Sequence, residues 1–303
     1  MNSFLDLHNV YYYPRFELVL NADGSAVSES DPYSLFQPKK QPHVDAAARA
    51  TLSGTYALIR SLPRSYYHQL VEYIPRLLSL PEEPLHLLYS PSLTRTEEYF
   101  FPHLLPEYVT PQAVAHDTLY HIERLVLPIL PPKNSAGHIP QTHINALRAA
   151  ALPTRPSKKT ERIYISRAGE APRRRRHIEN EEELTAALSL YGFKTVALEH
   201  LSITEAVEMF YDAEIVIGAH GAGLTNMIFS NNIDIIELHP LASTENHFKT
   251  LAGICGHRFH QWRGSAPYVH CNFSVDVDAT IQLLNPIAAR NPATVLAAPE
   301  AVR

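Results

Sequence analysis

The sequence predicts an α/β protein made of two Rossmann-type domains with mainly parallel sheets. From residue 161 onward, short runs rich in Val and Ile alternate with amphipathic stretches, which is the pattern of parallel strands joined by helices. The first half shows a looser version of this alternation. A Pro-rich, basic segment near residue 152 separates the halves. We place the boundary there, which gives an N-terminal domain of residues 1–152 and a C-terminal domain of residues 153–303.

The N-terminal domain is expected to contain short elements, because most of the 24 prolines fall in the first half of the chain. Asp23-Gly24 predicts a hairpin turn within residues 16–27. Pro75 is expected to kink a helix over residues 65–80. The other expected elements are strands at 55–60 and 85–90, a helix at 94–105, an extended segment at 123–130 and a helix at 144–152.

The C-terminal domain alternates regularly between strands and helices. Gly192 is expected to end its first helix, and Ser202 and Thr204 are candidates for the N-cap of its second. The last helix is a candidate to pack back on the N-terminal domain. The expected strands are 161–167, 193–200, 214–219, 234–240 and 257–262, and the expected helices are 180–192, 203–213, 224–231, 245–256 and 277–284.

Composition excludes several classes of protein. The apolar fraction of 45% is ordinary for a globular protein, and the net charge of −5 does not favour a nucleic-acid partner. Cys255 and Cys271 lack metal-like spacing, and a reducing compartment is the simpler interpretation. No run of about 20 apolar residues predicts a transmembrane segment, and the N-terminus lacks the features of a signal peptide. We therefore expect a cytoplasmic location.

Residues 214–229, EIVIGAHGAGLTNMIF, are the most informative stretch. They predict a buried strand, a glycine-rich turn and the start of a helix. A helix N-terminus offers backbone N–H groups and a partial positive charge, so the turn could hold a phosphate or an oxyanion, with His220 placed to donate. The alternative is a tight connection in which Gly218, Gly221 and Gly223 serve packing alone.

Other polar residues are predicted at the same edge of the sheet. Ligands bind outside the carboxyl ends of parallel strands, where Arg167 and Glu237 follow two of the expected strands. Arg167 could pair with a diphosphate, and a carboxylate such as Glu237 could accept from two ribose hydroxyls. Taken singly, each residue could be a surface ion pair or a loop cap; their joint position favours a nucleotide site.

The run Arg173–His177 is equally consistent with a solvated loop and with a phosphate clamp, for which Arg176 is the best member.

In the first half, His68 and Glu72 are four residues apart on one helical face. Either an imidazole held by a carboxylate or the carboxylate itself could remove a proton from a hydroxyl. The alternative is a boundary histidine beside a surface glutamate. The other histidines show no HExxH-like spacing, so no metal site is predicted. GxGxxG, GxxxxGK[ST] and Gly-x-Ser-x-Gly are also absent from the sequence.

The ordered motifs of the second half resemble glycosyltransferase family 61. The resemblance covers roughly residues 160–262, and its most specific motif is HGAGLTN; earlier, Tyr66–His68 with Glu72 and Pro75–Leu77 resembles the N-terminal histidine helix of that family. Ser65, His177 and Ala206 depart from the frequent residues of the family. The motifs are Ile163–Arg167, Arg175-Arg176 ahead of Asn180-Glu181, Gly192-Phe193, Ile217–Asn226 and Ile236–Pro240.

The resemblance implies a GT-B arrangement of two facing domains and an inverting glycosyltransferase. The donor would be a UDP-sugar held by the C-terminal domain, and no metal or other cofactor would be obligatory. Glu72 or His68 would be the base facing a glycan acceptor, such as a capsule or lipopolysaccharide, with a peripheral association with a membrane or a glycan-assembly system. A non-catalytic nucleotide- or glycan-binding module is the alternative function. Residues assigned to the donor are Arg167, Arg176, His220, Gly221, Ala222, Gly223, Leu224, Asn226 and Glu237.

Overall fold

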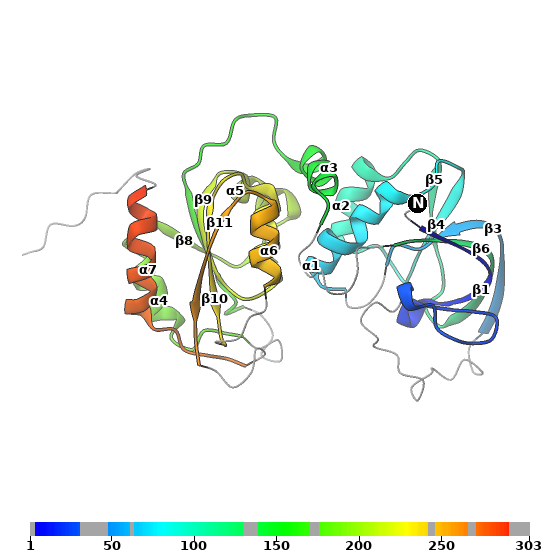
Figure 1. Ribbon diagram of the computed structural model, residues 1–303, viewed down its shortest axis with the longest axis horizontal. Coiled ribbons are helices and arrows are strands. Elements are labelled where there is room, and N and C mark those ends of the chain that lie inside the picture. Colours follow the sequence, from blue (N-terminus) through cyan, green and yellow to red (C-terminus); the bar gives the residue numbers. More distant parts are fainter. Residues whose placement is uncertain are drawn as a thin grey trace, which may run out of the picture. The chain divides into compact units, whose positions relative to one another are not determined.

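The structure is a computed structural model that describes residues 4–30, 48–60, 64–129, 139–169, 176–241, 246–265 and 271–290. The chain divides into two compact units, Met1–Ala150 and Ala151–Arg303, whereas the Pro-rich segment predicted a boundary after residue 152. Each unit has its own sheet with helices packed on it, and most neighbouring strands run parallel (Figure 1). The α/β class with mainly parallel sheets is therefore confirmed.

The first unit contains a six-stranded mixed sheet with the order β2-β1-β6-β3-β4-β5. The four strands from β6 to β5 in this order are parallel, whereas β1 pairs antiparallel with β2 and with β6. Buried side chains from β1, β3, β4 and β6 form one core cluster on this sheet. The strands are β1 (Phe4–Tyr13), β2 (Leu18–Leu20), β3 (Ala48–Ala57), β4 (Leu85–Tyr89), β5 (Val109–Ala113) and β6 (Thr118–Pro128).

The helix predicted around Pro75 is irregular. Because proline has no N–H, it cannot complete the α-helical hydrogen bond of its own turn. The chain instead passes from one α-helical turn through a wide π-helical turn into a 3-10 segment with Pro75 near its start. The helical segments are α1 (Tyr66–His68), the π turn Gln69–Tyr73, 3-10 turns at Ile74–Ser79, Pro14–Phe16 and Ser28–Ser30, α2 (Arg95–Leu104) and α3 (Gln141–Ala151).

The second unit contains a five-stranded sheet in which every pair of neighbours is parallel, with the order β11-β10-β9-β7-β8. The chain moves from β7 outward to β8, then returns to the other side of β7 to form β9, β10 and β11. The direction of winding therefore reverses between β7 and β9. The strands are β7 (Glu161–Ile165), β8 (Phe193–Val196), β9 (Ala213–Ala219), β10 (Asp234–His239) and β11 (Arg258–Arg263).

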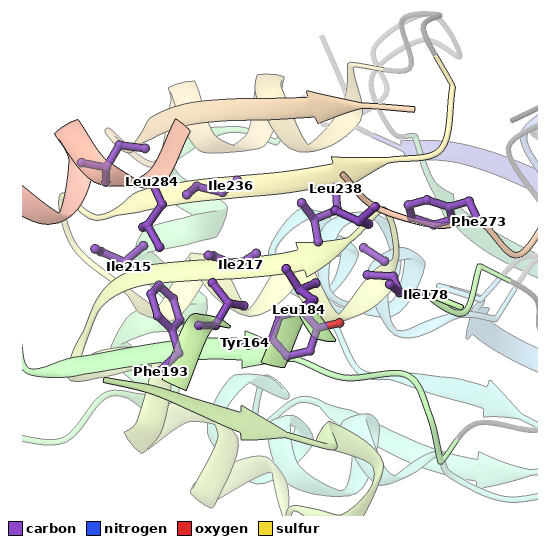
Figure 2. Close-up of a cluster of buried hydrophobic side chains, with 14 residues drawn as sticks. Tyr164, Ile178, Leu184, Phe193, Ile215, Ile217, Ile236, Leu238, Phe273 and Leu284 are labelled. Atoms are coloured by element: carbon purple, nitrogen blue, oxygen red, sulfur yellow. The ribbon is translucent and has the colours of Figure 1, made fainter. Parts of the chain in front are cut away.

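One face of this sheet packs on α4 and α7. Figure 2 shows Ile217, Leu238 and their neighbours on the strands beside Leu184 of α4 and Leu284 of α7. The last helix thus belongs to the core of its own unit, whereas the sequence left packing on the N-terminal domain open. The helices are α4 (Glu181–Ser189), α5 (Ile203–Tyr211), α6 (His247–Ile254) and α7 (Val277–Arg290), with 3-10 turns at Leu198–His200 and Ala222–Phe229.

Candidate functional site

The predicted donor residues lie around the point where the winding of the second sheet reverses. In open α/β sheets, ligands bind at this switch point, outside the carboxyl ends of the strands. Ser166-Arg167 follow β7, and His220-Gly221 follow β9, its neighbour across the switch point. The connection after β9 leads into the 3-10 helical segment Ala222–Phe229, where the sequence predicted a helix over residues 224–231. The fold therefore brings the two motifs together at one edge.

The three glycines of this connection serve two purposes. A Cβ at Gly218 would lie 3.2 Å from Cβ of Ile165, so this glycine allows close packing of β9 against β7. A Cβ at Gly223 would lie 3.0 Å from Cδ1 of Leu198 and 3.2 Å from Cγ2 of Ile165, so this glycine allows the turn to pack on both side chains. A Cβ at Gly221 would instead collide with the guanidinium of Arg167. Gly221 has an extended backbone, so the need for glycine at this position is spatial. The cation of Arg167 therefore lies directly against the turn.

The remaining residues of the turn are partly or fully buried. Ala222 is half-buried, whereas Leu224 and Asn226 have exposed fractions of 1% and 2%. Nδ2 of Asn226 donates to the carbonyl oxygen of Gly223 at 3.0 Å, which closes the turn on itself. In this structure Leu224 and Asn226 shape the turn, and contact of either residue with a donor stays a prediction.

His220 and Glu237 form a buried pair. Nδ1 of His220 lies 2.6 Å from Oε1 of Glu237, and Oε2 of Glu237 accepts from Nε2 of Gln261 at 2.6 Å. The exposed fractions of His220 and Glu237 are 4% and 1%. The carboxylate of Glu237 therefore contacts two side chains, and its contact with a ribose stays a prediction. Gln261 was not singled out from the sequence, because a glutamine in a strand carries no distinctive signal.

Three other rings surround the imidazole of His220. The ring centroids of His239, Phe248 and His247 lie 4.8, 5.3 and 5.7 Å from that of His220. Phe248 and His247 belong to the first turn of α6, and His239 ends β10. Nδ1 of His239 faces the backbone of Leu241, with its N at 3.2 Å and its O at 3.0 Å. These rings hold the plane of the His220 imidazole.

Arg176 lies where the chain re-enters the described residues, and Arg173–Arg175 lie outside them. Arg176 has a φ of 65°, in the left-handed region that non-glycine residues rarely occupy. The next residues are fixed to the segment before α7, because Ile178 forms a parallel bridge with Phe273 and Asn180 accepts from the N–H of Val275 at 2.9 Å. Both interpretations of the run Arg173–His177, a solvated loop and a phosphate clamp, remain predictions.

The helical pair predicted in the first unit is formed. Nδ1 of His68 lies 2.8 Å from Oε2 of Glu72, and the exposed fractions of the two side chains are 15% and 16%. The ring of His68 also contacts Tyr67 edge-on, with centroids 5.3 Å apart. An imidazole paired with a carboxylate near the surface is suited to accept a proton. The structure thus shows the pair but does not test its role.

A buried ionic network in the first unit was not predicted. Arg60, just beyond β3, pairs with Glu97 of α2 through two guanidinium nitrogens and lies 4.0 Å from Glu17. Arg64 also pairs with Glu17. Burial raises the pKa of the Glu17 carboxyl. Charged residues far apart in the sequence give no periodic signal, so this network could be found only from the fold.

The described residues offer neither a cluster suited to a metal ion nor a helix suited to a bilayer. Within the ranges that the structure describes, no group of three or more His, Cys, Asp or Glu side chains is arranged to hold a metal ion. Within the same ranges, no helix has the length and apolarity needed to cross a bilayer. The independence of the site from metals stays a prediction.

Comparisons with known proteins agree with the motifs at this edge. Over 159 residues, 46% of this chain and 30% of the relative, the chain is 30% identical to the EGF domain-specific O-linked N-acetylglucosamine transferase of Drosophila melanogaster. Over 64 residues, 21% of this chain and 12% of the relative, it is 36% identical to the Beta-1,2-xylosyltransferase of Arabidopsis thaliana. The matched region thus spans less than a third of either relative. The sequence pattern described as Glycosyltransferase 61 matches residues 66–235. This match covers more than half of the chain, which therefore belongs to the glycosyltransferase 61 family.

Proposed function

We propose that this chain is an inverting glycosyltransferase that moves a sugar from a UDP-sugar to a hydroxyl group of a glycan. The observation that carries the proposal is the guanidinium of Arg167 against Gly221 at the switch point of the second sheet. A cation, a glycine that admits close approach and a following helical segment together suit a diphosphate. The family match and the names of both relatives support transfer of a sugar.

In this proposal the second unit holds the donor and the first unit presents the acceptor, in a GT-B arrangement. His68 or Glu72 removes the proton of the acceptor hydroxyl. The oxygen then attacks the anomeric carbon from the face opposite UDP, and the bond from that carbon to the phosphate oxygen breaks. The electron pair of this bond leaves with UDP. Arg167 and the turn at His220–Asn226 stabilise the charge that develops on the diphosphate, so no metal is required.

The donor site is tested with a panel of UDP-, GDP-, CMP- and TDP-sugars in thermal unfolding. A ligand that binds only the native state raises the melting temperature, and we expect the UDP-sugars to do so. Arg167→Ala should lower kcat about 10²- to 10³-fold and weaken UDP binding less, because charge on the leaving group grows in the transition state.

The matched control is Arg258→Ala. Arg258 pairs with Asp234 at the amino end of β10, at the opposite edge of the sheet, so this variant should keep full turnover. Full turnover in Arg167→Ala, or a panel in which UDP-sugars have no effect, would refute the donor site.

A second pair of variants separates the enzyme from a non-catalytic binding module. His68→Gln and Glu72→Gln each remove one member of the proposed base pair. We expect UDP binding to be unchanged in both, and kcat to fall by about 10²-fold or more in at least one. Unchanged kcat in both variants would exclude this pair as the base. A wild-type chain that binds UDP-sugars but transfers no sugar would favour the binding module.

The finer assignments rest on the resemblance to the family. A capsule, lipopolysaccharide or related polysaccharide as acceptor, peripheral association with a membrane and a cytoplasmic location remain part of the proposal. Incubation with labelled UDP-sugars and purified surface glycans identifies the acceptor, and addition of EDTA tests the absence of a metal requirement.

A further inference from the structure

We propose that Glu237 is a positioning residue that keeps His220 protonated on both ring nitrogens, so that the imidazolium faces the diphosphate of the donor. The inference rests on the proposed function and assigns a role within the same site. It also replaces the ribose contact expected for an acidic residue that follows the glycine turn.

The register explains why these side chains meet. Glu237 lies opposite Gly218 of β9 on one side and opposite Gln261 of β11 on the other. Paired residues in a sheet share a face, and so do residues two apart in one strand. His220 follows Gly218 by two residues, and its N–H donates to the carbonyl oxygen of Leu238 at 3.0 Å. With no side chain on Gly218, the carboxylate of Glu237 is able to reach His220.

The contacts of the carboxylate determine the state of the imidazole. An ionised carboxylate only accepts hydrogen bonds, so Nδ1 of His220 carries the hydrogen that points to Oε1 of Glu237. Gln261 donates to the second oxygen and holds the carboxylate in place. Burial of His220 opposes a charged ring, and the proposal requires that the carboxylate 2.6 Å away outweighs this cost and favours the positive form. In that form Nε2, on the other side of the ring, also carries a hydrogen.

The surroundings leave the orientation of the ring little freedom. His239, His247 and Phe248 pack around the ring of His220. Within the described residues, the titratable groups that contact His220 include Glu237 from β10, His239 at the end of that strand and His247 from α6, and Arg167 lies against the adjacent Gly221. Among these groups, Glu237 is the anion that opposes three cationic or potentially cationic neighbours.

A positioning role for Glu237 is consistent with the two contacts that its carboxylate makes, to His220 and to Gln261. Each oxygen of Glu237 already contacts one side chain, His220 or Gln261, and the residue is 1% exposed, so a ribose hydroxyl has little access to either oxygen. An imidazolium beside Arg167 adds a second positive donor where the leaving diphosphate gains charge. Nε2–H donates a hydrogen bond to a phosphate oxygen and keeps its proton, while the acceptor proton goes to the base in the first unit. No further reactant is needed.

The test is Glu237→Gln, with Glu214→Gln as the matched control. Glutamine keeps the shape of the side chain and removes its charge. Because loss of the opposite charge disfavours the imidazolium, we expect the alkaline limit of kcat to move to lower pH. Affinity for UDP at low pH should change little. Glu214 pairs with Arg162 and is also buried, so Glu214→Gln should lower stability without moving the pH profile.

A second measurement does not depend on the variant folding. In the wild-type protein bound to UDP at pH 7.5, the ¹⁵N resonances of the His220 ring should report hydrogens on both nitrogens. A neutral ring, or a pH profile of Glu237→Gln that matches the wild type, overturns the role of Glu237 even when UDP binds and Arg167→Ala is impaired. Failure of the proposed function is distinguishable, because the wild-type protein would then bind no UDP-sugar.

Discussion

Individual glycines in the connection after β9 have different roles: some permit close packing, and one permits a cation to approach the turn. Gly218 and Gly223 fit the simpler interpretation, since both make room for Ile165. Gly221 differs because its missing Cβ makes room for a cation. The sequence predicted the turn, but it did not separate these uses, because the difference depends on which strand lies beside β9.

A pair of identical substitutions tests this distinction. Gly221→Ala should displace the guanidinium of Arg167, weaken UDP binding and lower kcat. Gly253→Ala introduces the same methyl group into α6, where a Cβ meets nothing within 4 Å, so it should stabilise the protein by about 0.5 to 1 kcal/mol. Calorimetric titration with UDP and urea unfolding measure the two effects. Equal UDP affinity in both variants would contradict the close approach at Gly221.

At the scale of elements, the second unit was predictable because each strand and helix has a regular pattern of its own. The strands that were not predicted, or were predicted with different bounds, have local physical reasons. β5 was not expected because it is a short strand containing Pro111, and proline within a strand is found mainly at sheet edges such as this one. β3 was expected at 55–60 but runs from Ala48 to Ala57, with a register shift between Leu52 and Thr55 beside the positive-φ Gly54. An irregular strand does not show a regular alternation of apolar and polar residues.

The hairpin at Asp23-Gly24 is reduced to a tight turn. Leu20 and Ala26 form a single antiparallel bridge across it. The longer pairing of β1 is with β2, through the turn at Pro14–Phe16, and with β6. The turn was predicted correctly, but β2 pairs mainly with β1 and not with the residues that follow the turn.

The helix that carries His68 is tied to α2 through one side chain. Gln69 donates to the carbonyl oxygen of Arg64 at 2.9 Å and accepts from Oγ1 of Thr94 at 2.8 Å. Thr94 is also the N-cap of α2, in a capping box with Glu97. One hydroxyl therefore stabilises the start of α2 and the position of the turn after His68.

Thr94→Val removes that hydroxyl while keeping the branched shape. Loss of an N-cap costs about 0.5 to 2 kcal/mol, so the free energy of unfolding should fall by about that amount in urea. Thr94→Ser keeps the hydroxyl and should recover most of the loss. If valine and serine give the same stability, the hydroxyl contributes neither through the N-cap nor through Gln69.

At the scale of the whole molecule, the Pro-rich segment after the boundary is anchored in the second unit. Arg155 donates to both carboxylate oxygens of Asp212, at 2.9 and 2.8 Å, and the N–H of Lys158 donates to the same carboxylate at 2.8 Å. Tyr211 donates to the carbonyl oxygen of Arg155 at 2.6 Å. Composition predicted a boundary in this segment, but not these contacts, because they join residues distant in sequence.

The anchor predicts a pH dependence of stability. The hydrogen bonds from Arg155 lower the pKa of the Asp212 carboxyl. A lowered pKa gives stability that is present above the unfolded value, near 3.8, and is lost as the pH falls through the folded value. Asp212→Asn should therefore cost about 1 to 2 kcal/mol at pH 7, a reduced amount because Arg155 is 38% exposed. Urea unfolding of the wild type and of Asp212→Asn should be measured at pH 7, 5 and 3. The difference between their free energies of unfolding should shrink only below pH 4.

The control for this anchor is Arg155→Ala. If Arg155 and Asp212 act as a pair, the double variant should lose less stability than the sum of the single variants. Additive losses would mean that each residue acts through other contacts.

Because each unit has its own sheet and core, binding of the donor should stabilise one unit more than the other. Saturation with UDP at a concentration of 100 times Kd adds about 2.7 kcal/mol to the unit that binds it, so amides that exchange only when that unit unfolds should slow by about 100-fold. We expect this slowing at Ile215–Ile217 in β9, and little change at Leu125–Leu127 in β6. Hydrogen exchange with and without UDP measures both, and Arg167→Ala should remove the difference. Equal slowing in the two strands would mean that the units unfold together, whereas slowing confined to β6 would move the donor site to the first unit.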